Sequence, residues 1–220
     1  MLKKIVTLSF DDGARQDIRL VELLNKYNIK STFNLNSAYI GLDSTKVQKE
    51  DLRTLYDGHE VASHTLTHPF LPDMEEKDII YQVEEDRLKL SELMGYEITG
   101  FAYPGGGVNF NRRVADIIKN NTGVKYARTT ADNFSFAPQK DLYVFEPTAR
   151  PYAGYDKFFE LTEKFLSLDS SSPALFYVWG HSTEFDMDNS WERFEEWCRI
   201  ITSDKNIIFC TNKEAFERLR

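Results

Sequence analysis

Two neighbouring carboxylates are the first feature of this sequence that could carry out chemistry. Residues 9–13 read SFDDG, so Asp11 and Asp12 directly follow a short apolar run. Adjacent side chains point in different directions, so one carboxylate can bind a cation while the other accepts a proton. A structural interpretation is also open, because Asp12 and Gly13 ahead of a helix form an ordinary helix-cap signal.

Two histidines form the second feature. Residues 63–68 read SHTLTH, and His64 and His68 are two of only four histidines in the chain. Imidazoles at this spacing can share one metal ion, although such pairs also occur by chance. With one carboxylate of the first feature they would form a two-histidine, one-carboxylate site, which leaves coordination positions open for water and substrate. We expect one divalent ion, Zn²⁺ first, with Fe²⁺, Co²⁺ or Mn²⁺ as alternatives.

A third histidine, His181, follows the most apolar run in the chain. In isolation, the favoured interpretation is a core histidine that donates to a backbone carbonyl. The remaining one, His59, precedes an apolar run rather than following it, so we expect a structural role there. The three features together place two aspartates and three histidines after apolar runs, which is the arrangement that a metal-assisted hydrolase needs.

The elements that must position these residues alternate along the chain. Short apolar or β-branched runs are followed by segments with helical periodicity, which favours parallel strands joined by helices. The predicted strands are Lys4–Phe10, Ser31–Asn36, Glu60–Ser63, Gly100–Tyr103, Lys125–Arg128, Leu142–Phe145, Ala174–Trp179 and Asn206–Phe209. The predicted helices are Ala14–Tyr27, Lys46–Tyr56, Glu75–Met94, Arg112–Asn120, Asp156–Leu168, Trp191–Thr202 and Lys213–Leu219.

Seven or eight strand–helix units predict a (β/α) barrel, with a doubly wound open sheet as the alternative. In the first strand, alternate residues from Ile5 to Asp11 share one face and those from Val6 to Phe10 share the other. We expect the more polar face to point into the barrel and to carry Asp11 to the rim. Active sites of such barrels lie at the carboxyl ends of the strands.

Composition limits the classes of function. The chain has 220 residues with 27 basic and 35 acidic side chains, which gives a net charge of −8. This size predicts one domain over residues 1–220, and the negative charge makes nucleic acids and anionic membranes poor partners. No apolar stretch approaches the ~20 residues of a membrane span. The two cysteines form no CxxC pair or disulfide framework and the first residues do not resemble a signal peptide, so we expect a cytoplasmic protein.

The three features resemble the motifs of the polysaccharide deacetylase family, also known as the NodB-homology or carbohydrate esterase family 4 enzymes. SFDDG is similar to the first motif, T-F-D-D-G, and SHTLTH to the metal motif, H-[ST]-x-x-H. Residues 101–106, FAYPGG, resemble a variant of the third motif, F-R-x-P-[YF]-G, and His181 lies where the last motif supplies a histidine. The resemblance implies a distorted (β/α) barrel of seven or eight parallel strands.

The resemblance also implies roles for individual residues. Asp12, His64 and His68 would be the metal ligands, Asp11 the general base and His181 the general acid. The bound metal would polarise an amide carbonyl and lower the pKa of the attacking water. The products would be acetate and a free amine, so the expected activity is hydrolysis of a carbon–nitrogen bond other than a peptide bond.

The third motif departs from the family pattern. Ala102 stands where the family has an arginine that steadies the base, and Arg128, after the next predicted strand, is a candidate replacement. The alternative is a surface arginine paired with any of the 35 acids. Gly105 replaces a bulky aromatic residue, which predicts a wider mouth and weaker sugar stacking. We assign Tyr103 and the backbone N–H of Gly105 to oxyanion or substrate contacts.

The family motif that tunes the acid histidine, D-x-x-D-W, is absent. Asp132 lies near its place in the sequence, while Glu184 and Asp186 closely follow His181, and the sequence does not choose among the three. After the sixth predicted strand, Thr148 and Arg150 could hold substrate, Arg150 being suited to a carboxylate or a phosphate. The prolines around them explain the same segment as a rigid turn.

The sequence therefore predicts a metal-dependent deacetylase that acts on an N-acetylated sugar or a related small amide. A hydrolase of a ureide or an O-acetyl ester would use the same site. A sugar-binding barrel that has lost catalysis is a rival, since Ala102 and the missing motif weaken the case for turnover. A phosphatase is a further rival, but it would favour Mg²⁺ and oxygen ligands over two close histidines. The oligomeric state is not indicated.

Overall fold

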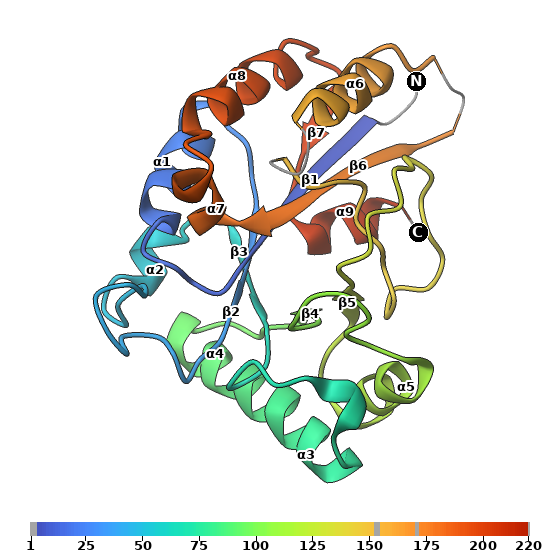
Figure 1. The fold of residues 1–220 in the computed structure, drawn as a ribbon. Helices are drawn as coiled ribbons and strands as arrows, with labels where there is room; N and C mark the ends of the chain where they lie inside the picture. Colours follow the sequence, from blue (N-terminus) through green and yellow to red (C-terminus); the bar gives the residue numbers. More distant parts are fainter. Residues whose placement is uncertain (1–3, 152–154, 170–171, 220) are drawn as a thin grey trace.

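The computed structural model describes residues 4–151, 155–169 and 172–219. In these residues, parallel strands form one seven-stranded sheet in the order β5-β4-β3-β2-β1-β6, with β7 also paired to β1 (Figure 1). β2 pairs with the carboxyl half of β1 and β7 with its amino half, so both share one edge of that strand. The strands are β1 (Lys4–Asp11), β2 (Thr32–Leu35), β3 (Glu60–Ser63), β4 (Gly100–Ala102), β5 (Tyr126–Arg128), β6 (Ala174–His181) and β7 (Ile207–Phe209).

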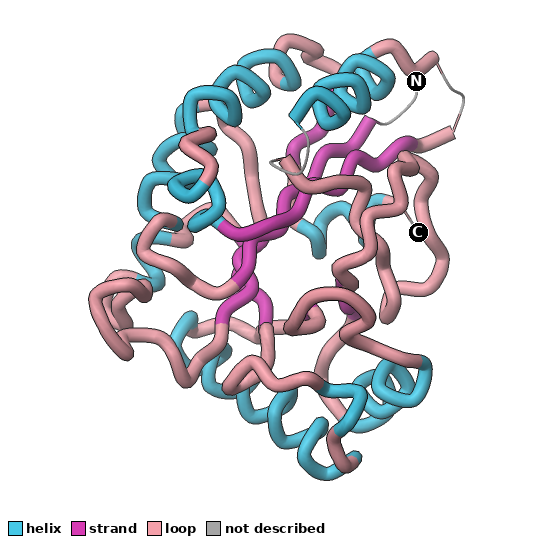
Figure 2. Tube along the Cα trace, viewed as in Figure 1, coloured by secondary structure: helices cyan, strands magenta, loops and turns pink. Residues whose placement is uncertain are grey.

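Helices lie around much of the curled sheet, and loops run along its remaining side (Figure 2). α1, α6, α7 and α8 lie on the side of β1 and β6, and α3, α4 and α5 lie at the other end, near β4 and β5 (Figure 1). The α-helices are α1 (Asp17–Lys26), α2 (Leu52–Leu55), α3 (Glu76–Ile80), α4 (Asp86–Met94), α5 (Arg112–Asn121), α6 (Tyr155–Leu166), α7 (Ser182–Met187), α8 (Trp191–Ile201) and α9 (Asn212–Arg218). A 3₁₀ turn, η1, spans Leu71–Asp73, and a π-helical turn, η2, spans Tyr81–Glu85. Within the described ranges, no helix combines the length and the apolar character needed to cross a bilayer.

The two faces of β1 follow the predicted alternation. Val6, Leu8 and Phe10 are fully buried in the main hydrophobic cluster, which also contains apolar side chains of α1 and α8. Burying side chains of this size contributes about 1.5–3 kcal/mol each. The other face is polar inside the barrel, where Thr7 Oγ1 donates to Asn212 Oδ1 at 2.8 Å and Ser9 Oγ accepts from Asn34 Nδ2 at 2.8 Å. The predicted inward face of β1 is therefore confirmed.

The barrel closes through an irregular segment, and the predicted strand Leu142–Phe145 is wrong. Residues 142–149 lie between β5 and β6 but form only single bridges, Arg128 to Phe145 and Ala149 to Val178. The ladder cannot continue, because the Glu146 N–H donates to the Gln139 side chain and Pro147 has no N–H to donate. The sheet is thus a distorted barrel of seven regular strands, as the resemblance implied.

Three further segments differ from the sequence-based expectation. The predicted helix Lys46–Tyr56 is helical only over α2, since Val47 N–H instead donates to the Gly13 carbonyl at 3.1 Å. The predicted helix Glu75–Met94 is present, with η2 in its middle. The short helix α7 was not expected, and β6 extends two residues beyond the predicted end, up to His181.

Candidate active site

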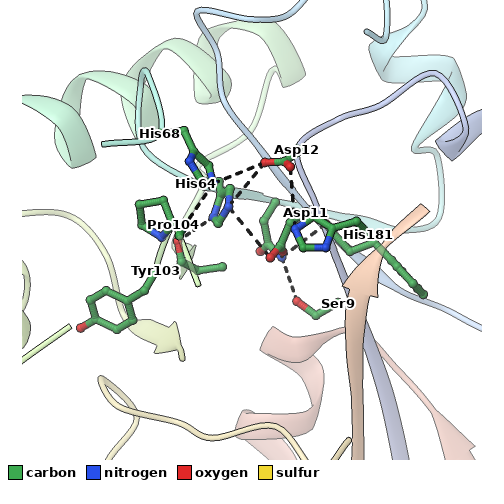
Figure 3. A network of polar contacts seen from close by, with 12 residues as sticks. Ser9, Asp11, Asp12, His64, His68, Tyr103, Pro104 and His181 are labelled. Carbon is green, nitrogen blue, oxygen red and sulfur yellow. Dashed lines mark hydrogen bonds and ion pairs between the residues drawn. The ribbon is translucent and has the colours of Figure 1, made fainter. Parts of the chain in front are cut away.

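The carboxyl ends of four strands bring the candidate residues together (Figure 3). Asp11 ends β1, His64 follows β3, Arg128 ends β5 and His181 ends β6. Asp11 and His181 are paired residues in the register of β1 and β6. The sheet itself therefore sets the distances between these side chains.

Asp12, His64 and His68 form a compact group of possible metal ligands. One ligand atom from each lies within 4.8 Å of the others. Asp12 Oδ1 lies 3.6 Å from His64 Nε2 and 3.7 Å from His68 Nε2. His64 is buried, whereas about a third of the side-chain surface of the other two is exposed. The group therefore has one buried side and one side open to solvent.

The backbone around this group is held in unusual conformations. Asp12 and His68 both have positive φ, 80° and 54°, which is uncommon for residues other than glycine and is found where a side chain must be aimed. The turn is fixed by Asn36, whose amide donates to the His64 carbonyl at 2.7 Å. His68 N–H in turn donates to Thr65 Oγ1 at 3.1 Å.

The donor chemistry fits a divalent cation. The Ala102 carbonyl can only accept, so the contact of 2.8 Å to His64 Nδ1 fixes the proton on that nitrogen. His64 Nε2 then carries a free lone pair, and it faces Asp12. Metal-binding histidines are typically oriented in this way, by a hydrogen bond from the other ring nitrogen. Burial lowers the pKa of His64, which favours the neutral imidazole that binds a metal.

Asp11 is buried and gripped by Arg128. Arg128 Nη2 lies 2.5 Å from both carboxylate oxygens, and Asn34 Nδ2 donates to Oδ1 at 2.7 Å. Burial opposes ionisation of Asp11, but the charge of Arg128, the nearby His64 and His181 and the hydrogen bond from Arg128 together outweigh it and hold the pKa of this carboxyl below its ordinary value. Arg128 is fully buried, so the alternative of a surface arginine is wrong. Ala102 and Arg128 are register partners on β4 and β5, so the guanidinium comes from the strand next to the expected position.

His181 lies on the other side of Asp12. Its Nε2 is 3.8 Å from Asp12 Oδ2, and its Nδ1 contacts Glu184 Oε2 at 3.1 Å. Burial lowers the pKa of His181, but the bond to Glu184 and the nearby aspartates outweigh it and raise that pKa above its ordinary value.

The structure chooses among the three carboxylates considered as partners of His181, and the choice is Glu184. Asp186 instead accepts from Trp191 Nε1 at 2.7 Å, and Asp132 accepts from Trp179 Nε1 at 2.6 Å. Glu184 also accepts the backbone N–H of His181 at 3.2 Å, as part of the cap of α7. The helix that the sequence reasoning missed thus delivers the carboxylate.

Of the four residues assigned to oxyanion or substrate contacts, Gly105 lies at the site. Its N–H donates to His68 Nε2, with 3.4 Å between the two nitrogens. Arg150 lies over the ring of Trp179, and its Nε contacts Asp132 at 3.4 Å. That ring neighbours the ring of His181, at 6.3 Å between centroids, so Arg150 belongs to the surroundings of the site.

Tyr103 and Thr148 are not brought to the site. The ring of Tyr103 points away from the cluster (Figure 3), and its hydroxyl donates to the Tyr143 carbonyl at 2.8 Å. Thr148 Oγ1 donates to the Ser135 carbonyl and accepts the Tyr177 N–H. Both side chains are buried and their hydrogen-bonding capacity is used within the fold. These two expectations are corrected. Tyr103 ends one predicted strand and Thr148 follows another, but their side chains point into the fold and not toward the site.

Two residues that support the base were not expected from the sequence. Asn34 donates to Asp11, and the Trp179 ring lies 4.6 Å from the guanidinium carbon of Arg128. Strand alternation could have found both. Asn34 shares a face with Thr32 on β2, and Trp179 shares a face with His181 on β6.

Comparison with known proteins defines the class of this molecule. Residues 1–127 match the model of the family described as polysaccharide deacetylase, so the chain belongs to that family. Peptidoglycan-N-acetylglucosamine deacetylase PgdA of Listeria monocytogenes is 30% identical over 119 residues, which cover 52% of this chain and 24% of that protein. Chitooligosaccharide deacetylase of Rhizobium leguminosarum bv. phaseoli is 30% identical over 103 residues, which cover 46% of this chain and 39% of that protein. The chain thus spans well under half the length of these curated relatives.

Solved structures with the same fold cover almost the whole chain. Peptidoglycan deacetylase PdaC of Bacillus subtilis superimposes with a TM-score of 0.63 at 17% identity, covering 98% of this chain and 91% of that one. A family 4 carbohydrate esterase from Bacillus anthracis gives a TM-score of 0.62 at 16% identity, with 98% and 83% covered. These likenesses confirm the predicted fold class.

Proposed function

We propose that this chain is a metal-dependent hydrolase that removes the acetyl group from an N-acetylated sugar. The observation that carries the proposal is the convergence of a possible metal-binding triad, a buried carboxylate and a histidine at one end of the barrel. The triad is Asp12, His64 and His68, whose ligand atoms lie within 4.8 Å of one another. Membership of the family and the names of the relatives support the same substrate class.

The triad would hold one divalent cation, and Zn²⁺ is our first choice. Two imidazole nitrogens and one carboxylate oxygen suit zinc, and they also accept Fe²⁺, Co²⁺ and Mn²⁺. When bound, such a cation polarises a carbonyl and lowers the pKa of water near it. The exposed side of Asp12 and His68 gives substrate access to the same place.

Asp11 is placed to act as the general base. Its Oδ2 lies 3.9 Å from His64 Nε2, so the carboxylate faces the triad and can accept a proton from a water molecule between them. Arg128 and Asn34 fix the orientation of the carboxylate. A base that is held in place needs little reorganisation when the proton arrives.

Gly105 and His181 would serve the later part of the reaction. As water attacks the acetyl carbon, negative charge develops on the carbonyl oxygen, and the N–H of Gly105 can donate to it. His181, with Nδ1 held by Glu184, can give the proton on Nε2 to the departing nitrogen. The carbon–nitrogen bond then breaks, which leaves acetate and the free amine of the sugar.

We also propose that the protein works in a reducing compartment, the cytoplasm. What supports this is that Cys198 and Cys210 are both free and buried. Fractionation of the source cells followed by immunodetection would place the protein; recovery outside the cytoplasm would contradict the proposal.

Acetate release tests the activity. Purified protein is incubated with N-acetylglucosamine oligomers and with O-acetylated sugars, with Zn²⁺, Co²⁺ or Mn²⁺ added. We expect acetate from the N-acetylated compounds, and a loss of about 10²–10⁴-fold in Asp11→Asn, the range typical of a general base. The exposed Asp73→Asn is the matched control and should keep full turnover.

Other outcomes would replace the proposal. Release of acetate only from the O-acetylated sugars would make the protein an esterase with the same site. Binding of the oligomers without any acetate release, by both the wild type and Asp11→Asn, would identify a carbohydrate-binding barrel that has lost catalysis.

A further inference from the structure

Phe70 is an exposed aromatic ring beside the candidate metal triad. It lies two residues after His68, and 46% of its surface is exposed. Phe70 Cδ2 is 4.0 Å from the position that a Cβ of Gly105 would occupy. The N–H of the same glycine lies 3.4 Å from His68 Nε2. The edge of the Phe70 ring therefore lies over the residue that borders the triad.

The backbone that carries this exposed ring is constrained on both sides. Pro69 precedes it and Pro72 follows two residues later, so φ is fixed at both positions. The next residue, Leu71, is fully buried in the second hydrophobic cluster and anchors the chain. The backbone on both sides of Phe70 is therefore constrained, and the ring stays at the surface in this structure. A constrained backbone reduces the conformational entropy that is lost when a ligand packs on the ring.

The segment next to Phe70 is open and carries no side chains over three residues. Residues 105–107 are three glycines, and Cβ atoms at Gly106 and Gly107 would meet nothing within 4 Å. The buried Asn109 holds this segment in place, since its amide donates to the carbonyls of Tyr103, Pro104 and Gly105 at 2.9–3.1 Å. Residues 105–107, the glycine strip, thus carry no side chains, and hydrogen bonds from Asn109 hold the segment that leads into them.

We propose that Phe70 is a stacking platform for a second sugar ring, the one linked to the acetylated sugar. The apolar C–H face of a pyranose would pack on Phe70, while the edge of that sugar lies along the glycine strip. Burying the exposed part of the ring supplies the driving force. This inference rests on the proposed function and narrows it, because the preferred substrate then contains at least two linked sugars.

The platform would offset an expectation drawn from the sequence. Glycine at position 105 predicted weaker sugar stacking, since the family pattern has an aromatic residue there. The structure has an aromatic ring within contact distance of that position, supplied by the loop that follows His68. An aromatic surface is therefore retained, although it comes from a different segment of the chain.

Binding measurements test the platform separately from catalysis. The full chain carrying Asp11→Asn is titrated calorimetrically with N-acetylglucosamine and with its β-1,4-linked tetramer. We expect tighter binding of the tetramer in this parent protein. Adding Phe70→Ala should raise the Kd for the tetramer about five- to tenfold and the Kd for the monosaccharide less than twofold. Phe70→Trp should retain the affinity. Tyr81→Ala, which removes an exposed ring at the start of η2, should leave the affinity unchanged.

Two results would overturn the platform. One is equal affinity of the parent protein for the monosaccharide and the tetramer, and the other is an unchanged tetramer Kd in the Phe70→Ala variant. Because binding is measured without turnover, the two proposals can fail independently. Tetramer binding that depends on Phe70, together with no acetate release by the wild type, would refute the deacetylase and leave the platform.

Discussion

Ala102 on β4 and Arg128 on β5 are register partners. This register explains how the candidate base Asp11 is paired with an arginine although position 102 holds an alanine. Register partners on neighbouring parallel strands point to the same face of the sheet, so a side chain at position 102 would also point into the barrel. The guanidinium contacts both oxygens of Asp11 and lies against the ring of Trp179. A residue that is missing from its motif can thus be replaced from the neighbouring strand, provided that the register places the two side by side.

Replacing Arg128 by alanine should separate this role from that of an ordinary ion pair. The change leaves Asp11 buried without a counter-charge, which costs about 3–5 kcal/mol of stability. We expect kcat for acetate release to fall about 100-fold, because the base is no longer held in position. The control is Arg112→Ala, which breaks an exposed ion pair with Asp141 and should change neither quantity by much. Unchanged turnover in a folded Arg128→Ala protein would remove Arg128 from the mechanism.

Glu184 and Asp186 provide a matched pair for testing the acid histidine. Glu184→Gln removes the charged partner of His181, so the raised pKa of that imidazole should fall. The acid works only when protonated, so the alkaline limb of kcat/KM should move to lower pH. Turnover at neutral pH should drop by about tenfold or more. Asp186→Asn, two residues further along α7, should leave the pH profile in place. Identical profiles for the two variants would contradict the assignment of Glu184.

At the scale of elements, the sequence was informative wherever one strand face is apolar and the other polar. Alternation along β1 correctly predicted that Asp11 points into the barrel, and the ends of β3 and β6 correctly predicted that His64 and His181 lie near it. Single-sequence periodicity failed where hydrogen bonds outside the element decide. Leu142–Phe145 has a strand-like composition, but its ladder of hydrogen bonds is interrupted. The Glu146 N–H donates to the Gln139 side chain, and Pro147 has no N–H.

The same limit applies to helices. The Lys46–Tyr56 segment has helical spacing, but its first half pairs with the loop after β1, where Lys46 Nζ donates to the Asp12 carbonyl. Helix α7 has only six residues, too few for a periodic pattern, and its cap depends on His181 at the end of β6. Both features are set by tertiary contacts that the local sequence does not contain.

Asp17 ties three elements together and should make stability depend on pH. It lies at the start of α1, fully buried, and accepts from Ser182 of α7 at 2.6 Å and from Tyr56, at the end of α2, at 2.7 Å. Burial raises its pKa from 3.8 to about 7, although these hydrogen bonds oppose the shift. The folded-state pKa is above the unfolded one, so this contribution to stability is full below about pH 4 and declines as pH rises to about 7.

Asp17→Asn should therefore remove a pH-dependent loss of stability. Relative to wild type, the variant should gain free energy of unfolding between pH 4 and pH 7, by an amount on the order of 4 kcal/mol at most. Urea unfolding at several pH values in this range measures the difference. Asp78→Asn, an exposed change on α3, should run parallel to wild type. A constant difference between Asp17→Asn and wild type would show that Asp17 does not titrate in this window.

At the scale of the whole molecule, the barrel separates the histidines. His64, His68 and His181 lie at the carboxyl ends of the strands, while His59 precedes β3 and lies at the other end, where its ring contacts Ser31 and Asn25. The net charge of −8 attracts divalent cations to the surface in general. A metal effect is thus informative only if it depends on the triad.

Thermal unfolding can make that distinction without any substrate. A cation that binds only the folded chain stabilises it by about 2.7 kcal/mol at 100 times its Kd. For a domain of this size that corresponds to a rise in Tm of roughly 5–10 °C. We expect Zn²⁺ to raise the Tm of the wild type, a chelator to reverse the rise, and His68→Ala to abolish it. His59→Ala should melt earlier, since it loses buried contacts, but should still gain the same increment with Zn²⁺. An equal rise in Tm with Zn²⁺ in His68→Ala and wild type would mean that the cation binds elsewhere. The triad would then not be the metal site.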